Sequence, residues 1–382
     1  MKSSTCYLSK IYFLCFLLTK IFGQTVQIGL MPQKNIEQFK IRVEQGSYII
    51  PELKDMELDP DAELLFSIQK NQIYLQINSK NYKKLDQISL YHSDEIAAFS
   101  FLQINGENEK KIRKYYGDLI VNFDNNKLFL IQQTDINDYL EGVVQAEAGF
   151  NHHPEFYKTQ AIISRTYAYR NWLKHQKEGY NLCDQVHCQA YKGILMEDPI
   201  ILDAVRKTDS WVVVDKNLQL IEALYYANSG GETVHSEHYW SNPVEYLRSI
   251  KDEFSIGQPN YRWEKKIKKK DFYQYLSREF NLPFSEEEWL SKLQHQNENR
   301  TTHLGDPALN IPLKRIRTDW NLRSTFFHLE DHNDEELLFL GKGYGHGVGL
   351  SQEGAMNMAK KGYHHFDILR YYYKNTQIIQ ID

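Results

Sequence analysis

The sequence predicts an α+β protein, in which a β-rich N-terminal region precedes a mixed α/β domain with a charged helical insertion. In the first part of the chain, short runs alternate apolar and polar residues, as in 39–43 (Phe-Lys-Ile-Arg-Val), and this period of two is typical of strands. Two later segments, 139–147 and 154–168, repeat apolar or small residues every three or four positions, which indicates helices. Glycine then occupies every second position of 341–349, a pattern that neither a stable helix nor a well-packed strand tolerates.

The first 23 residues have the layout of a secretory signal peptide. Lys2 and Lys10 precede the apolar run 11–18, and Gly23 closes a segment that is too short to span a bilayer. We therefore expect a protein that is secreted, periplasmic or associated with the cell wall. No later stretch is apolar enough to cross a membrane, so we expect no transmembrane segment in the mature chain.

The net charge argues against nucleic acid as a partner. The formal charge of the whole chain is −5, and residues 1–23 contain three Lys and no acidic residue, so their removal lowers the charge to −8. A chain with this balance repels a phosphate backbone.

The same patterns predict the domain organisation. The signal peptide at 1–23 is followed by a β-rich region at 24–113, which contains no arrangement of residues typical of catalysis. A domain at 114–382 begins with a hairpin around 124–126 and contains both helices and the glycine-rich segment. Within it, 264–318 is rich in charged residues and helical in pattern, so we interpret it as an insertion with a solvated face.

The first of the two helices carries an acidic residue on its apolar face. Leu140, Val143, Val144 and Glu147 lie at positions i, i+3, i+4 and i+7, which form one stripe. Burying a carboxylate costs on the order of several kcal/mol unless it is paired, hydrogen-bonded or protonated. Glu147 is therefore a candidate for proton transfer or cation binding. The alternative is structural: Glu147 bonds to a backbone amide or pairs with Arg165.

The glycine-rich segment predicts a tight loop rather than a nucleotide-binding motif. No Gly-Lys-Ser or Gly-Lys-Thr follows it, and its spacing differs from the dinucleotide fingerprint. We expect the loop to present His346, and the helix start at Ser351, to a ligand. The paired glycines of Ser229-Gly230-Gly231 also permit close approach of the backbone to a turn or a ligand. A purely structural glycine-rich turn is the alternative.

Five blocks in this order make the chain resemble the SpoIID family, named for stage II sporulation protein D. They are Tyr139-Leu-x-Gly-Val-Val-x-x-Glu147, Gln160-Ala-x-x-x-Arg165-Thr-Tyr-Ala168, Ser229-Gly-Gly-x-Thr233, Tyr246-Leu-Arg-Ser-Ile250 and Gly343-x-Gly-His-Gly-Val-Gly-Leu-Ser351-Gln352-x-Gly-Ala355. Each block is weak alone, but the ordered set is specific. The blocks cover roughly 114–382, apart from the charged insertion. The chain departs from the family pattern at Ala148, usually Met, and within 155–158, and neither departure removes a group that chemistry needs.

The resemblance implies a peptidoglycan lytic transglycosylase in which Glu147 is the catalytic acid and base. Protonated Glu147 would donate to the oxygen of the MurNAc–GlcNAc bond. The resulting carboxylate would take the proton of the C6 hydroxyl of the same MurNAc while a 1,6-anhydro ring closes. No water attacks, so the second carboxylate that glycoside hydrolysis normally needs is not required. The apolar helix face would supply the desolvation that raises the pKa of Glu147. Glu155 is the other candidate carboxylate, but it falls in a first helical turn, where it complements the helix dipole.

The resemblance also implies a set of residues around the sugar, with the glycan strands of peptidoglycan as the partner and no cofactor needed for the chemistry. We place there Gln160, Arg165, Ser229, Gly230, His346, Ser351 and Gln352. A second hypothesis follows from relatives that look like amidase enhancers, since the same groove could bind glycan without cleaving it and recruit or activate a cell-wall amidase. A structural or adhesion role is the third.

A last cluster of residues predicts a structural zinc ion. Cys183, His187 and Cys188 offer thiolate and imidazole groups four and five residues apart, which suits one loop wrapped around a tetrahedral metal. His175, at the end of the second helix, is the best candidate for the fourth ligand, and Asp184 is a weaker one. A disulfide between the two cysteines is the alternative in an oxidising compartment. The resemblance permits zinc without requiring it. Four protein ligands would close the site, so the metal would hold the loop near the catalytic residue rather than activate water.

Overall fold

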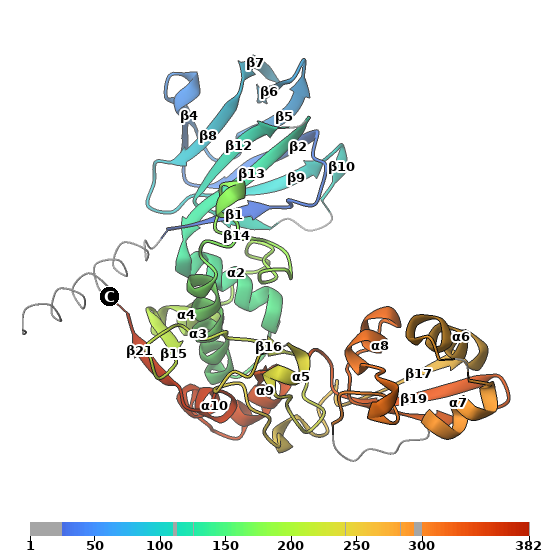
Figure 1. The fold of residues 1–382 in the computed structure, drawn as a ribbon. Helices are drawn as coiled ribbons and strands as arrows, with labels where there is room; N and C mark the ends of the chain where they lie inside the picture. Colours follow the sequence, from blue (N-terminus) through green and yellow to red (C-terminus); the bar gives the residue numbers. More distant parts are fainter. Residues whose placement is uncertain are drawn as a thin grey trace, which may run out of the picture. The chain divides into compact units, whose positions relative to one another are not determined.

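The computed structural model describes residues 25–109, 113–124, 126–240, 242–282, 284–293 and 300–381 (Figure 1). The chain divides into two compact units: unit 1 comprises Met1–Asn151, Gln160–Val212 and Ile379–Asp382, and unit 2 comprises His152–Thr159 and Val213–Ile378. The presence of helices and of several sheets, with most strands in the first part of the chain, confirms the predicted α+β class. The predicted signal peptide lies outside the described residues. Among those described, no helix combines the length and the apolar character that a membrane crossing needs.

Two seven-stranded sheets form most of unit 1. The first has the order β14-β1-β13-β12-β8-β3-β4, and the second has the order β10-β9-β2-β5-β6-β7 with β11 paired to β9. The strands are β1 (Thr25–Leu30), β2 (Gln38–Gln45), β3 (Tyr48–Ile50), β4 (Met56–Leu58), β5 (Glu63–Gln69), β6 (Gln72–Ile77), β7 (Lys80–Leu85), β8 (Gln87–His92), β9 (Ala98–Ile104), β10 (Glu107–Asn108), β11 (Lys114–Tyr116), β12 (Asp118–Asp124), β13 (Lys127–Asp135) and β14 (Leu182–Cys183).

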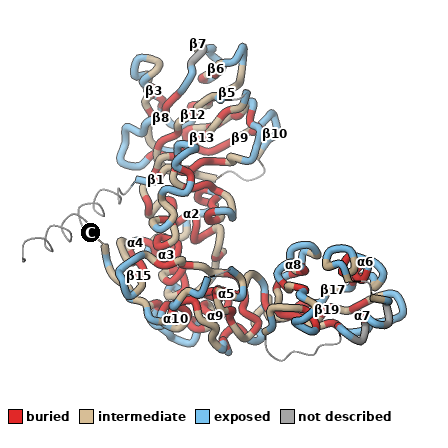
Figure 2. Tube along the Cα trace, in the orientation of Figure 1, coloured by how far each residue is buried: buried red, intermediate tan, exposed pale blue. Residues whose placement is uncertain are grey.

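The strands form because their alternating apolar residues share a core. Phe39, Ile41 and Val43 on β2 are fully buried, as the predicted period of two requires. Phe39 stacks on Phe66 of β5 with ring centroids 4.5 Å apart. Tyr48 on β3 meets Phe99 on β9 edge to face at 6.4 Å, so the two sheets contact each other through aromatic side chains. Figure 2 shows the buried residues following these strands.

The predicted hairpin pairs with strands of the N-terminal region. β12 and β13 are antiparallel, with Asp124 opposite Lys127, which confirms the hairpin. β1 pairs along its whole length with β13, and β12 pairs with β8. The boundary expected after residue 113 therefore falls inside one sheet. A two-stranded hairpin alone cannot bury its apolar face, and here the earlier strands complete the sheet.

The helices after the hairpin begin and end at the predicted residues. α2 (Ile136–Ala148) is capped by the side chain of Asp135, which accepts a hydrogen bond from the Asn137 amide, and it ends at Gly149 with φ of 72°. α3 (Pro154–Arg170) begins at proline, as expected. α4 (Pro199–Lys207) and β15 (Trp211–Val214) follow. Leu140, Val143 and Val144 have no exposed surface, which confirms the apolar stripe of α2.

The charged insertion folds as a lobe of unit 2 with its own apolar core. It contains β17 (Arg262–Lys268), α6 (Lys269–Phe280), α7 (Glu286–Leu293), α8 (Leu313–Asp319), β18 (Phe327–Asp331) and β19 (Glu336–Lys342), and its sheet has the order β17-β19-β18. Phe272, Trp289 and Phe339 are fully buried in this core. The helices within the predicted bounds 264–318 are present, but the lobe extends to Lys342, because β18 and β19 supply the surface on which the helices bury their apolar residues.

The remaining elements include the neighbours of the glycine-rich segment. They are β16 (Tyr225–Tyr226), α5 (Ser236–Tyr239), β20 (Leu350–Ser351), α9 (Gln352–Lys360), α10 (His365–Tyr372) and β21 (Gln377–Gln380), whose last two residues belong to unit 1. β16 and β20 are parallel, with Tyr226 beside Ser351. This pairing connects the segment before Ser229-Gly-Gly to the end of the glycine-rich segment.

Candidate functional site

Glu147 lies in the last turn of α2, at the half-buried end of the apolar stripe. Its Oε1 accepts a hydrogen bond from the backbone amide of Ala190, with N and O 2.6 Å apart. Glu147 therefore makes the hydrogen bond to a backbone amide that the structural alternative predicted. Glu147 is also less buried than Leu140, Val143 and Val144 of the same stripe, which have no exposed surface.

Arg165 is buried inside unit 1, where it bonds to other parts of the protein. The side chain has no exposed surface, and its guanidinium donates to the carbonyl of Thr208 at 2.6 Å and to Asn137 Oδ1 at 3.0 Å. Burial lowers the pKa of Arg165 to about 10, so it stays charged at neutral pH. These bonds connect α3 to the start of α2 and to the residue that follows α4.

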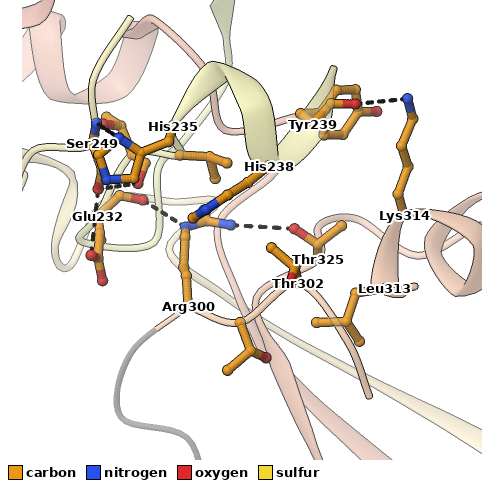
Figure 3. Close-up of a pocket in the computed structure, with 13 residues that line it drawn as sticks. Glu232, His235, His238, Tyr239, Ser249, Arg300, Thr302, Leu313, Lys314 and Thr325 are labelled. Carbon is orange, nitrogen blue, oxygen red and sulfur yellow. Dashed lines mark hydrogen bonds between the residues drawn. The ribbon is translucent and has the colours of Figure 1, made fainter. Parts of the chain in front are cut away.

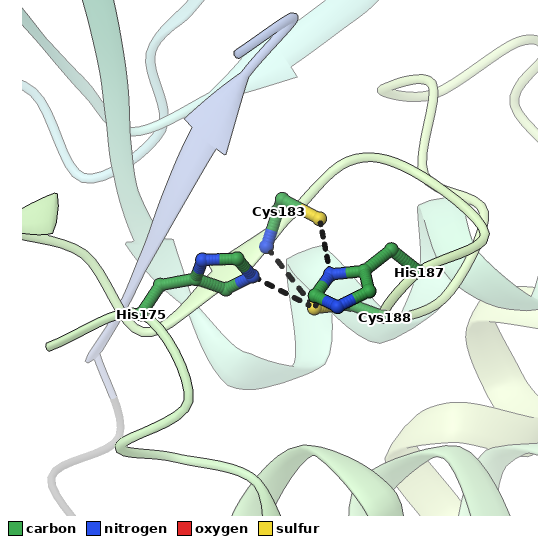
Figure 4. Close-up of side chains that lie close together, drawn as sticks. All are labelled: His175, Cys183, His187 and Cys188. Carbon is green, nitrogen blue, oxygen red and sulfur yellow. Dashed lines mark hydrogen bonds between the residues drawn. The ribbon is translucent and has the colours of Figure 1, made fainter. Parts of the chain in front are cut away.

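Four predicted metal ligands meet in unit 1 (Figure 4). Their ligand atoms all lie within 4.8 Å of one another. Cys183 Sγ is 3.8 Å from Nδ1 of His187, and Cys188 Sγ is 3.4 Å from Nε2 of His175. Both cysteines are free thiols, and the hydrogen bond from Cys188 lowers the pKa of Cys183. His175 lies in the turn after α3 rather than at its end, because the helix stops at Arg170.

The geometry of this cluster fits a tetrahedral ion. Bond lengths of about 2.0–2.3 Å place the ligands of a tetrahedral zinc roughly 3.3–3.8 Å from one another. The set of two thiols and two imidazoles is one that structural zinc sites use. The cluster is also connected to Glu147, since Ala190, which donates to that carboxylate, follows Cys188 by two residues. The loop that would hold a metal therefore also positions the candidate catalytic residue.

The glycine-rich segment in unit 2 has the left-handed backbone that only glycine adopts readily. Gly345 and Gly347 have φ of 120° and 88°. A Cβ on Gly345 would lie 2.6 Å from Cβ of Tyr226, and one on Gly347 would lie 2.7 Å from Cγ2 of Val234. Neighbouring residues of the protein therefore leave no room for a side chain at these two positions. This agrees with the alternative interpretation of the segment as a structural glycine-rich turn.

His346 binds the backbone through both ring nitrogens. Its Nε2 lies 3.1 Å from the carbonyl oxygen of Tyr225, and its Nδ1 accepts from the amide of Val348, also at 3.1 Å. This pattern requires a neutral ring with the proton on Nε2. Burial lowers the pKa of His346 to about 4. The half-buried ring packs against Tyr226 and Tyr239. Because both ring nitrogens are bonded to the backbone, a ligand could contact only the carbon atoms and the face of the His346 ring.

Ser229 and Ser351 belong to a buried polar network centred on Asp252. Asp252 is fully buried and accepts from the hydroxyl groups of Ser229 at 2.8 Å and Tyr372 at 3.1 Å. Ser351 Oγ accepts from the amide of Ser229 at 3.2 Å, and it caps α9 as predicted, by accepting from the Gly354 amide. Asp252 was not predicted from the sequence, because an Asp between Lys251 and Glu253 has the pattern of an ordinary charged surface segment.

The other predicted sugar contacts are also enclosed. Gln160 has no exposed surface and donates to Ser164 Oγ at 3.1 Å. Gln352 is 8% exposed at the start of α9. Gly230 has φ of 71°, and a Cβ there would lie 2.8 Å from the carbonyl carbon of Lys342. Contact between these residues and a sugar stays a prediction.

Comparison with known proteins finds one matching family model and several relatives of this chain. The family model described as SpoIID, stage II sporulation protein, matches residues 124–214. Stage II sporulation protein D of Bacillus subtilis (strain 168) is 29% identical over 270 residues, which cover 66% of this chain and 76% of that protein. The protein of the same name from Bacillus amyloliquefaciens is 26% identical over the same length. These matches support assignment of the chain to the SpoIID family. The amidase enhancer of Bacillus subtilis (strain 168) is 24% identical over 294 residues, or 63% of this chain and 40% of that protein.

The SpoIID match contains Glu147 and the whole metal cluster. Residues 124–214 run from the hairpin through α2, α3 and the loop of Cys183 and Cys188 to β15. The glycine-rich segment lies beyond the matched range. Together, the family and the amidase enhancer relative fit a cell-wall-related function, and they confirm the resemblance that the five blocks predicted.

Glu155, the other candidate carboxylate, is held in its ionised form. Burial alone would raise its pKa, but hydrogen bonds from Lys158 and His365 lower it to about 2. Oε1 lies 2.6 Å from Nζ of Lys158, and Oε2 lies 2.7 Å from Nδ1 of His365. A carboxylate with these partners is a poor proton donor, so Glu147 remains the better candidate in this chain.

An acidic pocket in unit 1 was not predicted from the sequence. Its volume is about 770 Å³, and Asp138 and Glu141 of α2 are among its lining residues. Burial raises the pKa of Asp138 to about 6 and that of Glu141 to about 7. The two acids lie at i and i+3 on one face of α2, so their spacing was visible, but it resembles that of an ordinary solvated helix face.

Proposed function

We propose that this protein is a peptidoglycan lytic transglycosylase with Glu147 as its single acid and base. The family is associated with cell-wall lytic activity, and this chain keeps the carboxylate in the matched segment. The observation that carries the proposal is the position of Glu147: half-buried at the end of an apolar stripe and oriented through Oε1 by the Ala190 amide. A fixed orientation with partial access to solvent is what a group that transfers protons to a bound sugar needs.

The proposed reaction returns Glu147 to its starting state. Protonated Glu147 donates to the glycosidic oxygen, and the bond from this oxygen to C1 of MurNAc breaks. The C6 hydroxyl of the same MurNAc then attacks C1 and gives its proton to the carboxylate. No water is consumed, so the products are a chain ending in 1,6-anhydro-MurNAc and one with a free hydroxyl on GlcNAc.

The test is cleavage of peptide-free glycan strands, followed by mass spectrometry. Wild-type protein should release fragments that end in 1,6-anhydro-MurNAc. Glu147→Gln should fold normally and lose these products by at least about a hundredfold, the lower range for removing general acid–base catalysis. Glu141→Gln removes a carboxylate from the same helix and should keep activity. Reducing-end products would indicate hydrolysis, and equal activity of Glu147→Gln would exclude this residue.

We further propose that His175, Cys183, His187 and Cys188 hold a structural zinc ion. The support is the distance between their ligand atoms and the chemistry of the set, two thiols and two imidazoles. Bound zinc would fix the loop whose Ala190 amide orients Glu147. With four protein ligands the metal has no open position for water, so it takes no part in the proton transfers. Purified protein should contain about one zinc per chain, and Cys183→Ser should lose it.

The second candidate function is activation or recruitment of a cell-wall amidase without cleavage. A specific observation favours it: the chain is similar to a protein named amidase enhancer. Under this hypothesis, strands bind but no anhydro product forms, and a wall amidase releases stem peptides faster when the protein is present. Glu147→Gln would leave that stimulation unchanged.

A further inference from the structure

A small pocket in unit 2 gathers positive charge (Figure 3). Two of its lining residues, Val234 and Arg300, lie beside Gly347 of the glycine-rich segment. Its volume is about 230 Å³. Residues 232–235, His238 and Tyr239, which follow Ser229-Gly-Gly, line one side of it. Arg300–Thr302 and the start of α8 line the other. Both segments on the second side belong to the charged insertion, outside the blocks that resemble the family.

Arg300 is the central positive group of the pocket. Its Nε donates to the carbonyl of Glu232 at 2.7 Å, and its Nη2 donates to the carbonyl of Ser229 at 2.6 Å. Nη1 lies 3.5 Å from Thr325 Oγ1, so this nitrogen is the least firmly bonded of the three. Among the described residues, Arg300 forms no ion pair. Burial lowers the pKa of Arg300 to about 10, which leaves the guanidinium charged at neutral pH. Carbonyl groups orient this charge without neutralising it.

Lys314 adds a second positive group at the edge of the pocket. Its Nζ donates to the carbonyl of Tyr239 at 2.8 Å and lies 4.6 Å from the centre of the same ring. Among the described lining residues, Glu232 is the one carboxylate, and it already accepts from Ser249 Oγ at 3.4 Å and pairs with Lys251 at 3.1 Å. The pocket therefore has an excess of positive charge in a protein whose net charge is negative.

An exposed aromatic side chain stands next to this charge. Trp240 follows the pocket residue Tyr239 and is 40% exposed. Its ring packs against Tyr239 and His346, with centroids 4.8 Å and 5.6 Å away, so its orientation is fixed by the glycine-rich segment. A fixed, half-exposed indole offers a flat apolar face, with which the face of a sugar ring can make close contact.

We propose that this pocket binds the carboxylate of an acidic saccharide whose ring stacks on Trp240. Arginine and lysine form charge-assisted hydrogen bonds with carboxylates, and the guanidinium can bind both oxygens. The inference rests on the proposed function for the identity of the sugar: in peptidoglycan the acidic sugar is muramic acid, which carries a lactyl carboxylate. The pocket would then distinguish muramic acid from the neutral N-acetylglucosamine beside it.

The test compares binding of two saccharides of equal length to full-length Glu147→Gln protein, which cannot cleave them under the proposed mechanism. One is a peptide-free GlcNAc–MurNAc oligosaccharide, and the other is a chito-oligosaccharide, which lacks the lactyl group. By calorimetry the first should bind about tenfold more tightly or better, a preference that increased salt should weaken. Sodium lactate alone should bind at least tenfold more weakly than the acidic saccharide. If lactate bound as tightly as the acidic saccharide, the pocket would be a site for small anions, and the proposal would be overturned.

Variants locate the preference in the pocket. Lys314→Glu, an exposed position, should lower the preference at least threefold, and Arg300→Lys should lower it while keeping the charge and the fold. Trp240→Ala should weaken the binding of both saccharides. Lys216→Gln, an exposed lysine of unit 2 paired with Glu245, is the matched control and should change nothing. Equal affinity for the two saccharides, or a preference that Lys314→Glu leaves intact, would overturn the inference without affecting the cleavage test. A preference without cleavage by the wild type would instead contradict only the proposed function.

Discussion

At the scale of single residues, His346 shows that a histidine of a motif can use both ring nitrogens to stabilise the fold while its ring packs beneath a proposed binding surface. Both ring nitrogens bind the backbone of unit 2, and the ring supports Tyr239 and Trp240. Protonation would place a second proton on Nδ1, where the Val348 amide already donates. The neutral ring is therefore part of the folded structure, and it cannot serve as a general acid without breaking the loop.

This arrangement predicts a pH dependence with a definite sign. The pKa of His346 is about 4 in the folded protein, below its usual value near 6.5, so the unfolded chain binds the proton first as the pH falls. The stability that the neutral ring contributes is thus present above pH 6.5 and is lost between about 6.5 and 4. NMR titration of the ring should show a midpoint near 4. His346→Gln should make the loss of stability over this window shallower, and a ring midpoint near 6.5 would contradict the prediction.

At the scale of elements, the glycine-rich segment owes its shape to the neighbours of each glycine. Gly347→Ala should destabilise unit 2 for two reasons: its φ of 88° disfavours a side chain, and a Cβ would meet Val234 at 2.7 Å. Gly362→Ala is the matched control, because Gly362 has φ of 89° but no heavy atom within 4 Å of the position that the alanine Cβ would occupy. We expect about 1 kcal/mol for the control and roughly 1–3 kcal/mol more for Gly347→Ala, measured by urea unfolding. Equal losses would mean that the contact with Val234 is relieved at no cost.

The elements that the sequence predicted well are those with a local signature. The apolar stripe of α2, its stop at Gly149, and the start of α3 at Pro154 all depend on residues a few positions apart. The predicted insertion ended too early, because the core of the lobe joins α6 and α7 to strands more than thirty residues later. Sequence periodicity reports which face of an element is apolar, but not which distant element covers it.

The candidate site divides in the same way. The metal cluster could be predicted because its ligands have restricted chemistry and short spacing, and the structure brings all four together. Ser229 and Ser351 were predicted to contact sugar, yet they bond within the protein around Asp252. A small polar residue beside glycine has the same pattern in a ligand cradle and in a buried network. Only the positions of its distant partners decide between the two.

At the scale of the whole molecule, the two units should respond differently to loss of the metal. All four proposed ligands lie in unit 1, so zinc binding would stabilise that unit by mass action, and a chelator would remove the stabilisation. Hydrogen exchange should therefore increase around 175–190 and along α2 after metal removal, while unit 2 keeps its protection. Cys183→Ser should reproduce the effect without chelator, and Lys216→Gln in unit 2 should not. Loss of the metal should also lower the activity, because the loop whose Ala190 amide orients Glu147 would become more mobile. A metal-free preparation two hydrogens lighter than the reduced chain would establish a disulfide between Cys183 and Cys188 and contradict the zinc proposal.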